Sequence, residues 1–421
     1  MRELRIEKSS DSRALAIATI VMGIIAGASS GLLSIVLDAT ERVFFHFTET
    51  NAIPVAFSAT PLNRLLAPII GALIVSVVWY FMQLHYRPVK LGKAVDGEKM
   101  PMGATIMHVT AQVFYVGTGG SIGRELAPRE AGAMWAQSWI RLGDRIGWLK
   151  LAPEDRRLLI AAAAGAGFAG VYIAPITGAM FCLEILYKKI DKKAVIVSLT
   201  MAAIATMVGA IVKGWQPYYL VASRQFSLRL IPFVVIVAPL MGFLGIWYKR
   251  LIGRASALRV RDRRIFITMP LAGALTGAVA CFFPEIMGNG RGVAQMAINV
   301  TSVSHSAVAL LLFGFFAKGL VTLATISGGG YGGTLTPSIA MGSSLGVLLG
   351  MIFIQAMPGE PLMQFAVLGA AFFLAATQQA PLMAMFMLFE VCHLNFSALL
   401  PLGLGVALSM AISSWMQAKK A

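Results

Sequence analysis

The chain has 421 residues, of which 57% are hydrophobic and only 13% are charged, and its mean hydropathy is +0.76. This composition excludes an ordinary soluble domain, in which about a quarter of the residues are charged, and it indicates an integral membrane protein. The net charge of +16 does not indicate a nucleic-acid partner, because the basic residues gather in short segments beside apolar runs, where membrane proteins carry them.

Several uncharged runs are long enough to cross a bilayer core as a helix, which takes about 20 residues. In chain order these runs are 14–37, 65–82, 194–212, 231–248 and 265–283. Two more runs, 158–183 and 319–359, are too long for one straight crossing, and both contain glycine and proline where a helix can break. The expected fold is an all-α integral membrane protein with broken and tilted transmembrane helices.

Charge predicts the orientation of these helices. Residues 1–13 are polar and of mixed charge, and the apolar run after them is too long for a cleaved signal peptide. Two basic clusters, 188–193 and 249–264, are separated by two expected spans, so both lie on one side, and their excess of Lys and Arg marks that side as cytoplasmic. We expect a multi-pass protein of a bacterial inner (plasma) membrane with both termini cytoplasmic.

Two sequence patterns occur twice. An Ala-Pro pair followed by a Glu nine residues after the Pro appears at 174–185 and at 380–391. The pattern G-x-x-L-x-P appears at 123–128 and at 332–337. The copies are offset by 206 and 209 positions, which indicates a duplication into two membrane repeats, 14–213 and 231–416, with a short cytoplasmic tail at 417–421. Repeats interrupted by Gly and Pro are typical of transporters that bind substrate between the repeats.

Each G-x-x-L-x-P motif follows a cluster of glycines and contains a proline suited to the first turn of a helix. A helix that begins inside the membrane presents free backbone N–H groups and the positive end of its dipole, which together can replace the hydration shell of a small anion. The backbone of these motifs is therefore the predicted anion site. Its candidate residues are Gly123, Arg124, Leu126, Gly333, Thr334 and Leu335.

Glu125 lies inside the first motif. A carboxylate within a membrane segment is costly and is a functional-site hypothesis by default. At a helix N-terminus it can occupy an anion site and block it until a proton or an arriving anion displaces it, which makes Glu125 a candidate gate and proton acceptor. The alternative is a structural ion pair with Arg124, or with Arg129 one helical turn further on.

These motifs resemble those of the CLC family of chloride channels and proton-coupled anion transporters. Gly123-Arg124-Glu125 resembles the family motif G-[KR]-E-G-P, whose Glu is the external gate, and residues 333–337 resemble G-x-F-x-P, whose amides line the central anion site. The Ala-Pro helices and the segment 284–292 also have family counterparts. The resemblance implies a CLC-type inverted repeat, a homodimer with one pore per subunit, and chloride or a similar small anion as substrate, with protons as a second substrate in exchangers. The chain ends at Ala421, so we expect no cytoplasmic CBS domains.

The sequence also departs from the family pattern. Leu126 and Ala127 replace Gly-Pro after the gate, and the family motif G-S-G-I-P has no good match in 87–96. By alignment on Pro401, Phe396 falls where many relatives place a Tyr that binds the central anion, so we expect Phe396 at the anion site. Ile185 occupies the place of the internal proton-accepting Glu of well-understood exchangers, which favours a channel or a differently routed exchanger.

Other functions remain as alternatives. A fluoride-exporting CLC protein fits the degenerate first motif, and a secondary transporter of another anion could use Arg124 and Arg129. An intramembrane enzyme does not fit, because the G-x-S-x-G strings at 119–123 and 342–346 lie in helical membrane context, where small residues serve helix packing. Scattered Cys and His residues predict neither a metal site nor a cofactor.

Overall fold

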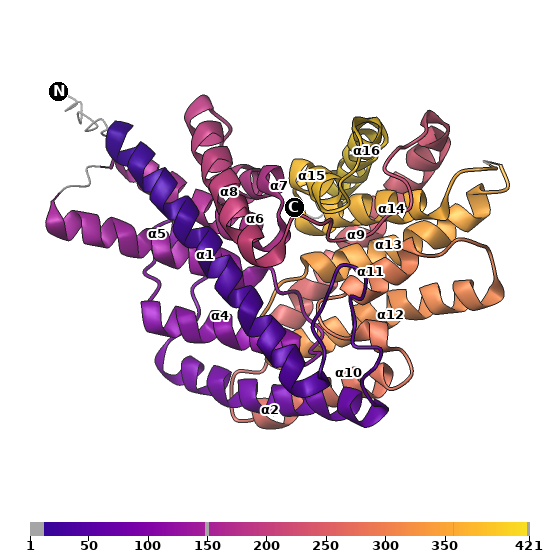
Figure 1. The fold of residues 1–421 in the computed structure, drawn as a ribbon, viewed down its shortest axis with the longest axis horizontal. Helices are drawn as coiled ribbons and strands as arrows, with labels where there is room; N and C mark the ends of the chain where they lie inside the picture. Colours follow the sequence, from indigo (N-terminus) through magenta and orange to yellow (C-terminus); the bar gives the residue numbers. More distant parts are fainter. Residues whose placement is uncertain (1–11, 148–150, 357, 419–421) are drawn as a thin grey trace. The chain divides into compact units, whose positions relative to one another are not determined.

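The computed structural model describes residues 12–147, 151–356 and 358–418, and within them the chain is helical (Figure 1). Residues 1–11 and 419–421, which fall in the two expected terminal segments, lie outside this description. The α-helices in chain order are α1 Ser12–Phe45, α2 Pro61–His85, α3 Leu91–Val95, α4 Met102–Gly117, α5 Leu126–Ile146, α6 Pro153–Tyr172, α7 Pro175–Met180, α8 Lys192–Lys213, α9 Ile231–Ala257, α10 Ile265–Ala280, α11 Arg291–Ile298, α12 His305–Gly328, α13 Leu335–Phe353, α14 Leu362–Gln378, α15 Pro381–Val391 and α16 Leu399–Ala418. A π-helical turn, Phe181–Tyr187, continues α7, and short 3₁₀ turns lie at Leu228–Leu230, Pro284–Ile286 and Phe396–Ala398.

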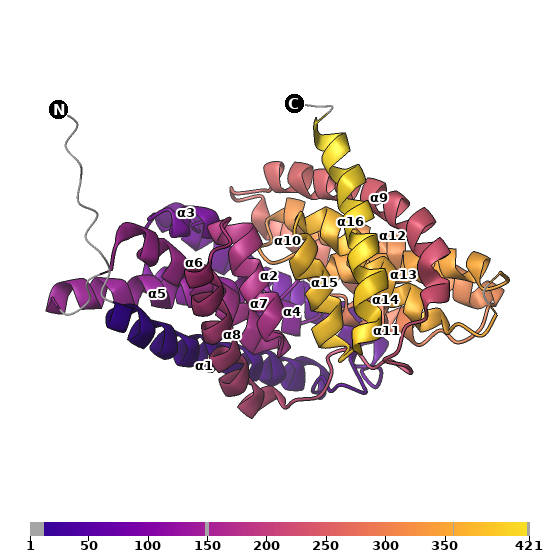
Figure 2. The ribbon, with the colours of Figure 1, turned by 90° about the horizontal axis from the view of Figure 1, so that it is seen from above.

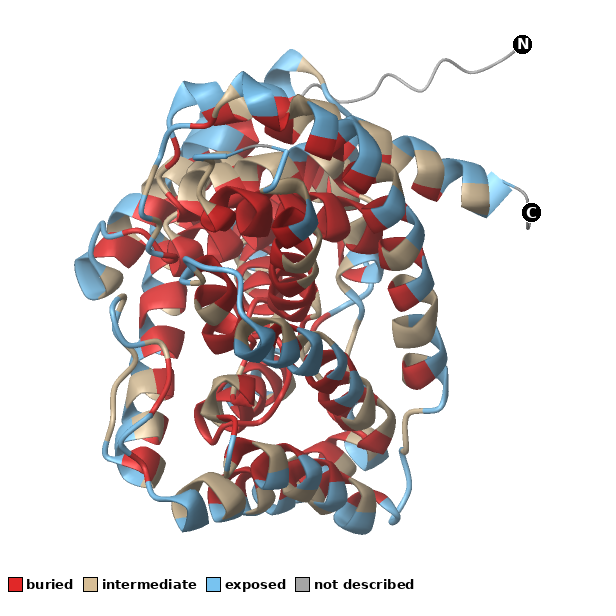
Figure 3. Ribbon diagram, turned by 90° about the vertical axis from the view of Figure 1, so that its right-hand side faces the viewer, coloured by how far each residue is buried: buried red, intermediate tan, exposed pale blue. Residues whose placement is uncertain are grey.

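Seven helices among the described residues are long and apolar enough to cross a membrane. Four of the five predicted runs lie in such helices, namely α1, α2, α8 and α9, and the fifth forms α10, whose 16 residues are shorter than a usual span. Many helices in Figure 3 are buried along one side and exposed along the other, the pattern expected where one face meets protein and the other meets lipid. The prediction of an all-α membrane protein is confirmed.

Both of the longer apolar runs break where they contain glycine or proline. α12 ends at Gly328, and α13 begins seven positions later at Leu335. Gly329 has a φ of 125°, and the N–H of Gly330 donates to the carbonyl of Thr325. This hydrogen bond closes the helix end in the manner of a Schellman motif, which needs a residue in the left-handed region and therefore favours glycine.

The same helix ends occur in both halves of the sequence. At the end of α4, Gly119 has a φ of 87° and the N–H of Gly120 donates to Tyr115, as Gly330 donates to Thr325 after α12. α6 and α14 are each followed by a left-handed residue, Ile173 and Gln379, then by an Ala with a φ of −134° or −141° and by a Pro that begins the next helix. Matching backbone geometry at matching offsets is what a duplicated sequence predicts.

The chain forms two compact units that do not follow the repeat boundaries. The first contains the described residues up to Ser34 together with Arg87–Val109 and Pro128–Trp215, and the second contains Ile35–Tyr86, Thr110–Ala127 and the residues from Gln216 onward. In the first unit, α6 packs against α7 and α8. In the second, α14 is buried from Leu362 to Thr377 and packs against α9, α13, α15 and α16 (Figures 1 and 2). Part of the expected first repeat thus belongs to the same unit as the second repeat.

Candidate functional site

The two G-x-x-L-x-P motifs meet inside the second unit. Gly123 and Gly333 exchange two backbone hydrogen bonds, each 2.8 Å between nitrogen and oxygen, as an isolated antiparallel bridge. A Cβ atom added to either glycine would overlap the carboxylate of Glu125. The absence of a side chain at both positions therefore leaves the room that this carboxylate occupies.

Glu125 is fully buried and lies at the start of α13. Its Oε1 accepts a hydrogen bond of 2.6 Å from the backbone nitrogen of Leu335, the first residue of that helix, and its Oε2 accepts one of 3.3 Å from the hydroxyl of Thr336. A helix N-terminus favours negative charge through its unsatisfied N–H groups and its dipole. The carboxylate therefore sits where a small anion would be stabilised by the same groups.

Arg124, the neighbour of Glu125, is directed to another carboxylate. Its guanidinium pairs with Glu49 at 2.8 Å and donates to the hydroxyl of Tyr218 at 3.2 Å. Glu49 also pairs with Arg291, whose guanidinium stacks on the ring of Tyr218 and donates to its carbonyl oxygen. The alternative in which Arg124 forms a structural ion pair with Glu125 is not the observed arrangement. Arg129, in the first unit, lies over the rings of Phe168 and Phe181.

The remaining predicted anion-binding residues divide into two groups. Thr334 precedes α13 as its N-cap, next to Gly333, and Leu126 is the residue that begins α5 directly after Glu125. Phe396 is different, because it is 82% exposed and its ring packs on Phe389. A side chain so exposed does not line a fully enclosed carboxylate, so the prediction that Phe396 contributes to this site is wrong.

Two residues near the motifs were missed by the sequence reasoning. Lys318 of α12 is fully buried, and its Nζ donates to the hydroxyl of Ser121 at 2.9 Å and to the carbonyl oxygens of Ile286 and Gly288 at 3.0 and 2.7 Å. Lys318 thereby links Ser121, which precedes the first G-x-x-L-x-P motif, to the segment 284–292 through hydrogen bonds. A lone Lys within an apolar span was a usable signal for it. Gln378, the last residue of α14, donates to the Thr334 hydroxyl at 3.4 Å and carried no such signal.

The model of the voltage gated chloride channel family matches residues 89–414 of this chain. The chain belongs to that family. The predicted CLC-type fold and family are thus confirmed, and the family consists of membrane channels and transporters. Ser121, the Ser of the first G-x-S-x-G string, lies in the break between α4 and α5 and not in a helix as predicted, and its hydroxyl accepts a hydrogen bond from the Lys318 ammonium and lies 3.3 Å from the Thr322 hydroxyl.

Relatives and solved structures of the family resemble this chain over most of its length. It is 28% identical over 394 residues to the voltage-gated ClC-type chloride channel ClcB of Salmonella typhi, covering 90% of this chain and 91% of that protein. It is 27% identical over 359 residues to the H(+)/Cl(-) exchange transporter ClcA of Klebsiella pneumoniae, covering 80% of this chain and 73% of that protein.

Two solved structures share the fold at low sequence identity. A slow cyanobacterial Cl−/H+ antiporter superposes with a TM-score of 0.81 at 22% identity, covering 97% of this chain and 96% of that one. A CLC-type fluoride/proton antiporter gives 0.72 at 20% identity, with 95% of each chain covered. These likenesses concern the fold.

Proposed function

We propose that this protein carries small inorganic anions, chloride first among them, across a bacterial plasma membrane, and that Glu125 is its gate. The observation that carries the proposal is the hydrogen bond from the Leu335 nitrogen to the Glu125 carboxylate. An anion that binds at the N-terminus of α13 competes with this carboxylate for the same N–H group. The relatives described as chloride channels and H(+)/Cl(-) exchangers support chloride as the substrate.

The gate opens when the Glu125 carboxylate leaves the N-terminus of α13. Protonation removes the negative charge that the Leu335 N–H and the helix dipole stabilise, so the neutral carboxyl group is held less strongly than the anion that replaces it. The vacated site then offers the hydroxyl of Thr336 and the backbone of Thr334 and Leu335, whereas Gly333, whose N–H donates to Gly123, contributes the space beside them. From the first motif, the backbone at Gly123, Arg124 and Leu126 completes the proposed anion path.

Two modes of transport use such a gate. In a channel, protonation of Glu125 only opens the path, whereas in an exchanger the proton continues to the other side. Ile185, in the π-helical turn that follows α7, supplies no proton acceptor where exchangers of the family carry a Glu. This feature favours a channel or a differently routed exchanger, and a measurement of proton movement separates the two modes.

The test uses the protein reconstituted in liposomes with a chloride electrode outside and a pH dye inside. Glu125→Gln removes the charge that holds the gate closed, so passive chloride flux rises by about ten- to a hundredfold, the range of one charged hydrogen bond, and loses its pH dependence. Glu98→Gln, at an exposed Glu that pairs with Lys93, is the matched control and leaves flux unchanged. Flux in Glu125→Gln that stays low and pH-sensitive refutes the gate, and proton uptake driven by a chloride gradient in wild type identifies an exchanger.

Orientation and assembly belong to the same proposal. The basic segments 188–193 and 249–264 favour cytoplasmic placement of these loops, and with them of both termini. We infer a homodimer with one pore in each subunit, as the resemblance to the family implies. Chemical cross-linking in membranes tests the dimer, and labelling of single cysteines introduced in the two basic segments tests the orientation.

A further inference from the structure

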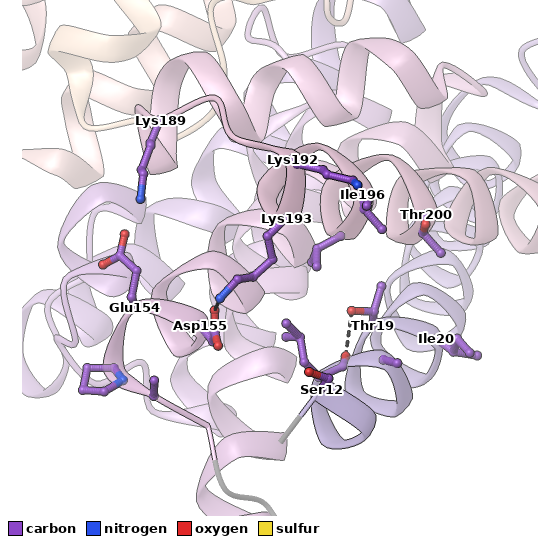
Figure 4. A pocket seen from close by; sticks show the side chains of 15 residues that line it. Ser12, Thr19, Ile20, Glu154, Asp155, Lys189, Lys192, Lys193, Ile196 and Thr200 are labelled. Atoms are coloured by element: carbon purple, nitrogen blue, oxygen red, sulfur yellow. Dashed lines mark hydrogen bonds and ion pairs between the residues drawn. The ribbon is translucent and has the colours of Figure 1, made fainter. Parts of the chain in front are cut away.

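A pocket of about 1070 Å³ lies in the first unit, whereas Glu125 belongs to the second (Figure 4). Its walls come from α1, from the start of α6 and from the start of α8 together with the loop before it. This volume is several times what an inorganic anion needs, and it is in the range of sites that hold molecules with tens of atoms.

The walls of the pocket are apolar along two helices that are long enough to span a membrane. Leu15 and Ile20 line it from α1, and Ile196 and Val197 line it from α8. Ile20 is 49% exposed and Ile196 is 55% exposed, so this side of the pocket opens outward. On a membrane-spanning segment, outward-facing isoleucines meet lipid acyl chains.

The other end of the pocket carries lysines. Lys189, Lys192 and Lys193 line it at the start of α8, opposite Glu154 and Asp155 at the start of α6. Lys193 pairs with the buried Asp155 at 2.7 Å, and Lys189 pairs with Asp191 at 3.3 Å. The Ala194 N–H donates to Asp191, and this hydrogen bond lowers the pKa of the Asp191 carboxyl, so that this partner of Lys189 stays ionised.

Lys192 is left as the available cation. Among residues 12–147, 151–356 and 358–418, no carboxylate pairs with Lys192. Figure 4 shows its side chain reaching toward Ile196 on the same face of α8, whereas Lys193 points to Asp155. The ammonium of Lys192 thus lies at the polar end of an otherwise apolar wall.

We propose that this pocket binds one anionic phospholipid, with its phosphate at Lys192 and an acyl chain along Ile20 and Ile196. A charged head joined to a long apolar tail matches both ends of the pocket, and basic pockets between transmembrane helices are typical sites for such head groups. A free phosphate would leave the apolar wall uncovered, and a zwitterionic phospholipid would bring its own cation next to Lys192.

Native mass spectrometry of the purified full chain tests the proposal with phosphatidylglycerol and phosphatidylcholine of identical acyl chains. Wild type retains phosphatidylglycerol in preference to phosphatidylcholine, and Lys192→Gln reduces that retention about fivefold, which corresponds to the ~1 kcal/mol typical of one lysine at an anionic lipid surface. Lys192→Arg preserves the charge and the retention. Lys213→Gln, at the opposite end of the same helix, is the matched control and retains the lipid as wild type does.

Three results would overturn the proposal. Equal retention of the two lipids shows that head-group charge plays no part, and unchanged retention in Lys192→Gln places the lipid elsewhere. Displacement of bound phosphatidylglycerol by inorganic phosphate identifies a plain anion site. Because the readout is lipid bound to folded protein, it does not depend on the gate at Glu125.

Discussion

The carboxylate of Glu125 accepts a 2.6 Å hydrogen bond from the backbone nitrogen of Leu335, a residue 210 positions further along the chain. This contact joins the side chain of the first motif to the helix N-terminus of the second. This buried carboxylate accepts hydrogen bonds from one N–H group and one hydroxyl group at the end of a helix dipole, while the adjacent Arg124 pairs with Glu49. Such a carboxylate is held by features that also bind anions, so it can exchange with one.

Thr336 provides the weaker of the two contacts to the gate. Thr336→Val keeps the shape of the side chain and removes the hydroxyl that donates to Glu125 Oε2 at 3.3 Å. A hydrogen bond of this kind stabilises the closed position of Glu125 by about 0.5–1.5 kcal/mol. Without it the carboxylate leaves the N-terminus of α13 more readily, so chloride flux at neutral pH rises about two- to tenfold.

Liposome efflux at several pH values checks this prediction. The control is Thr19→Val, which removes a hydroxyl that donates within its own helix, to the carbonyl of Leu15. If Thr336→Val lowers flux, the hydroxyl serves the passing anion more than it serves the closed gate.

Gly333 leaves space for the closed gate. In Gly333→Ala the new Cβ overlaps the Glu125 carboxylate, which therefore cannot bind at the N-terminus of α13. We expect chloride flux to lose its pH dependence, as in Glu125→Gln. Gly403→Ala is the control, because a Cβ there makes only ordinary contact with Met385.

A double variant separates this effect from general damage to the site. If Gly333 acts through the gate alone, adding Gly333→Ala to Glu125→Ala changes flux no further, since the clashing carboxylate is already gone. A further large loss of flux in the double variant would mean that the added methyl group blocks the anion path itself.

The sequence predicted those features that depend on local pattern. Runs of apolar residues marked the spans, and Gly and Pro marked the break between Gly328 and Leu335, because both follow from residues close together in the chain. The hydrogen bond between Glu125 and Leu335 could not be predicted directly, because no local rule fixes a contact between residues 210 positions apart. The sequence predicted only that the two motifs converge on one anion. Alignment placed Phe396 in a family position but carried no information on its burial, and the structure leaves it exposed.

The partner of Arg124 shows a second limit. Glu49 lies in the irregular segment between α1 and α2, where periodicity gives no orientation for a side chain. When the position of Glu49 is not known, the adjacent Arg124 and Glu125 are the obvious candidates for an ion pair. Only the fold brings Glu49 between Arg124 and Arg291.

His393 links stability to pH on a surface segment after α15. Desolvation, followed by repulsion from Arg224, lowers the pKa of His393 below its usual 6.5. A lowered histidine pKa means that the folded state binds fewer protons than the unfolded state, so this contribution to stability is present above pH 6.5 and is lost as the pH falls toward the folded pKa.

His393→Asn removes this titration, and Asn tolerates the positive φ of 50° at this position. The melting temperature of wild type in detergent should fall more steeply below pH 6.5 than that of the variant. His305→Asn, at the exposed start of α12, is the control and follows wild type. Parallel melting curves for His393→Asn and wild type would exclude His393 as the source of the acid sensitivity.

Glu49 forms ion pairs with two buried guanidinium groups, those of Arg124 and Arg291. The exposed fractions of the Glu49, Arg124 and Arg291 side chains are 8%, 7% and 5%. Glu49→Gln leaves both arginines without their shared negative charge, and breaking a buried ion pair from one side costs about 3–5 kcal/mol of unfolding free energy. The melting temperature of the purified protein should fall accordingly. Asp144→Asn, which breaks the half-exposed pair with Arg156, costs about 1 kcal/mol or less and serves as the control.

The same variant also affects the gate, because Arg124, which loses its ion pair with Glu49, is the chain neighbour of Glu125. A guanidinium released from Glu49 can pair with the Glu125 carboxylate and hold it in its charged form, so chloride flux in Glu49→Gln requires a lower pH than in wild type. The double variant Glu49→Gln, Arg124→Gln removes the competing cation and restores the pH dependence of wild type. If the acid shift persists in that double variant, it does not arise from Arg124, and the role of Glu49 is confined to stability.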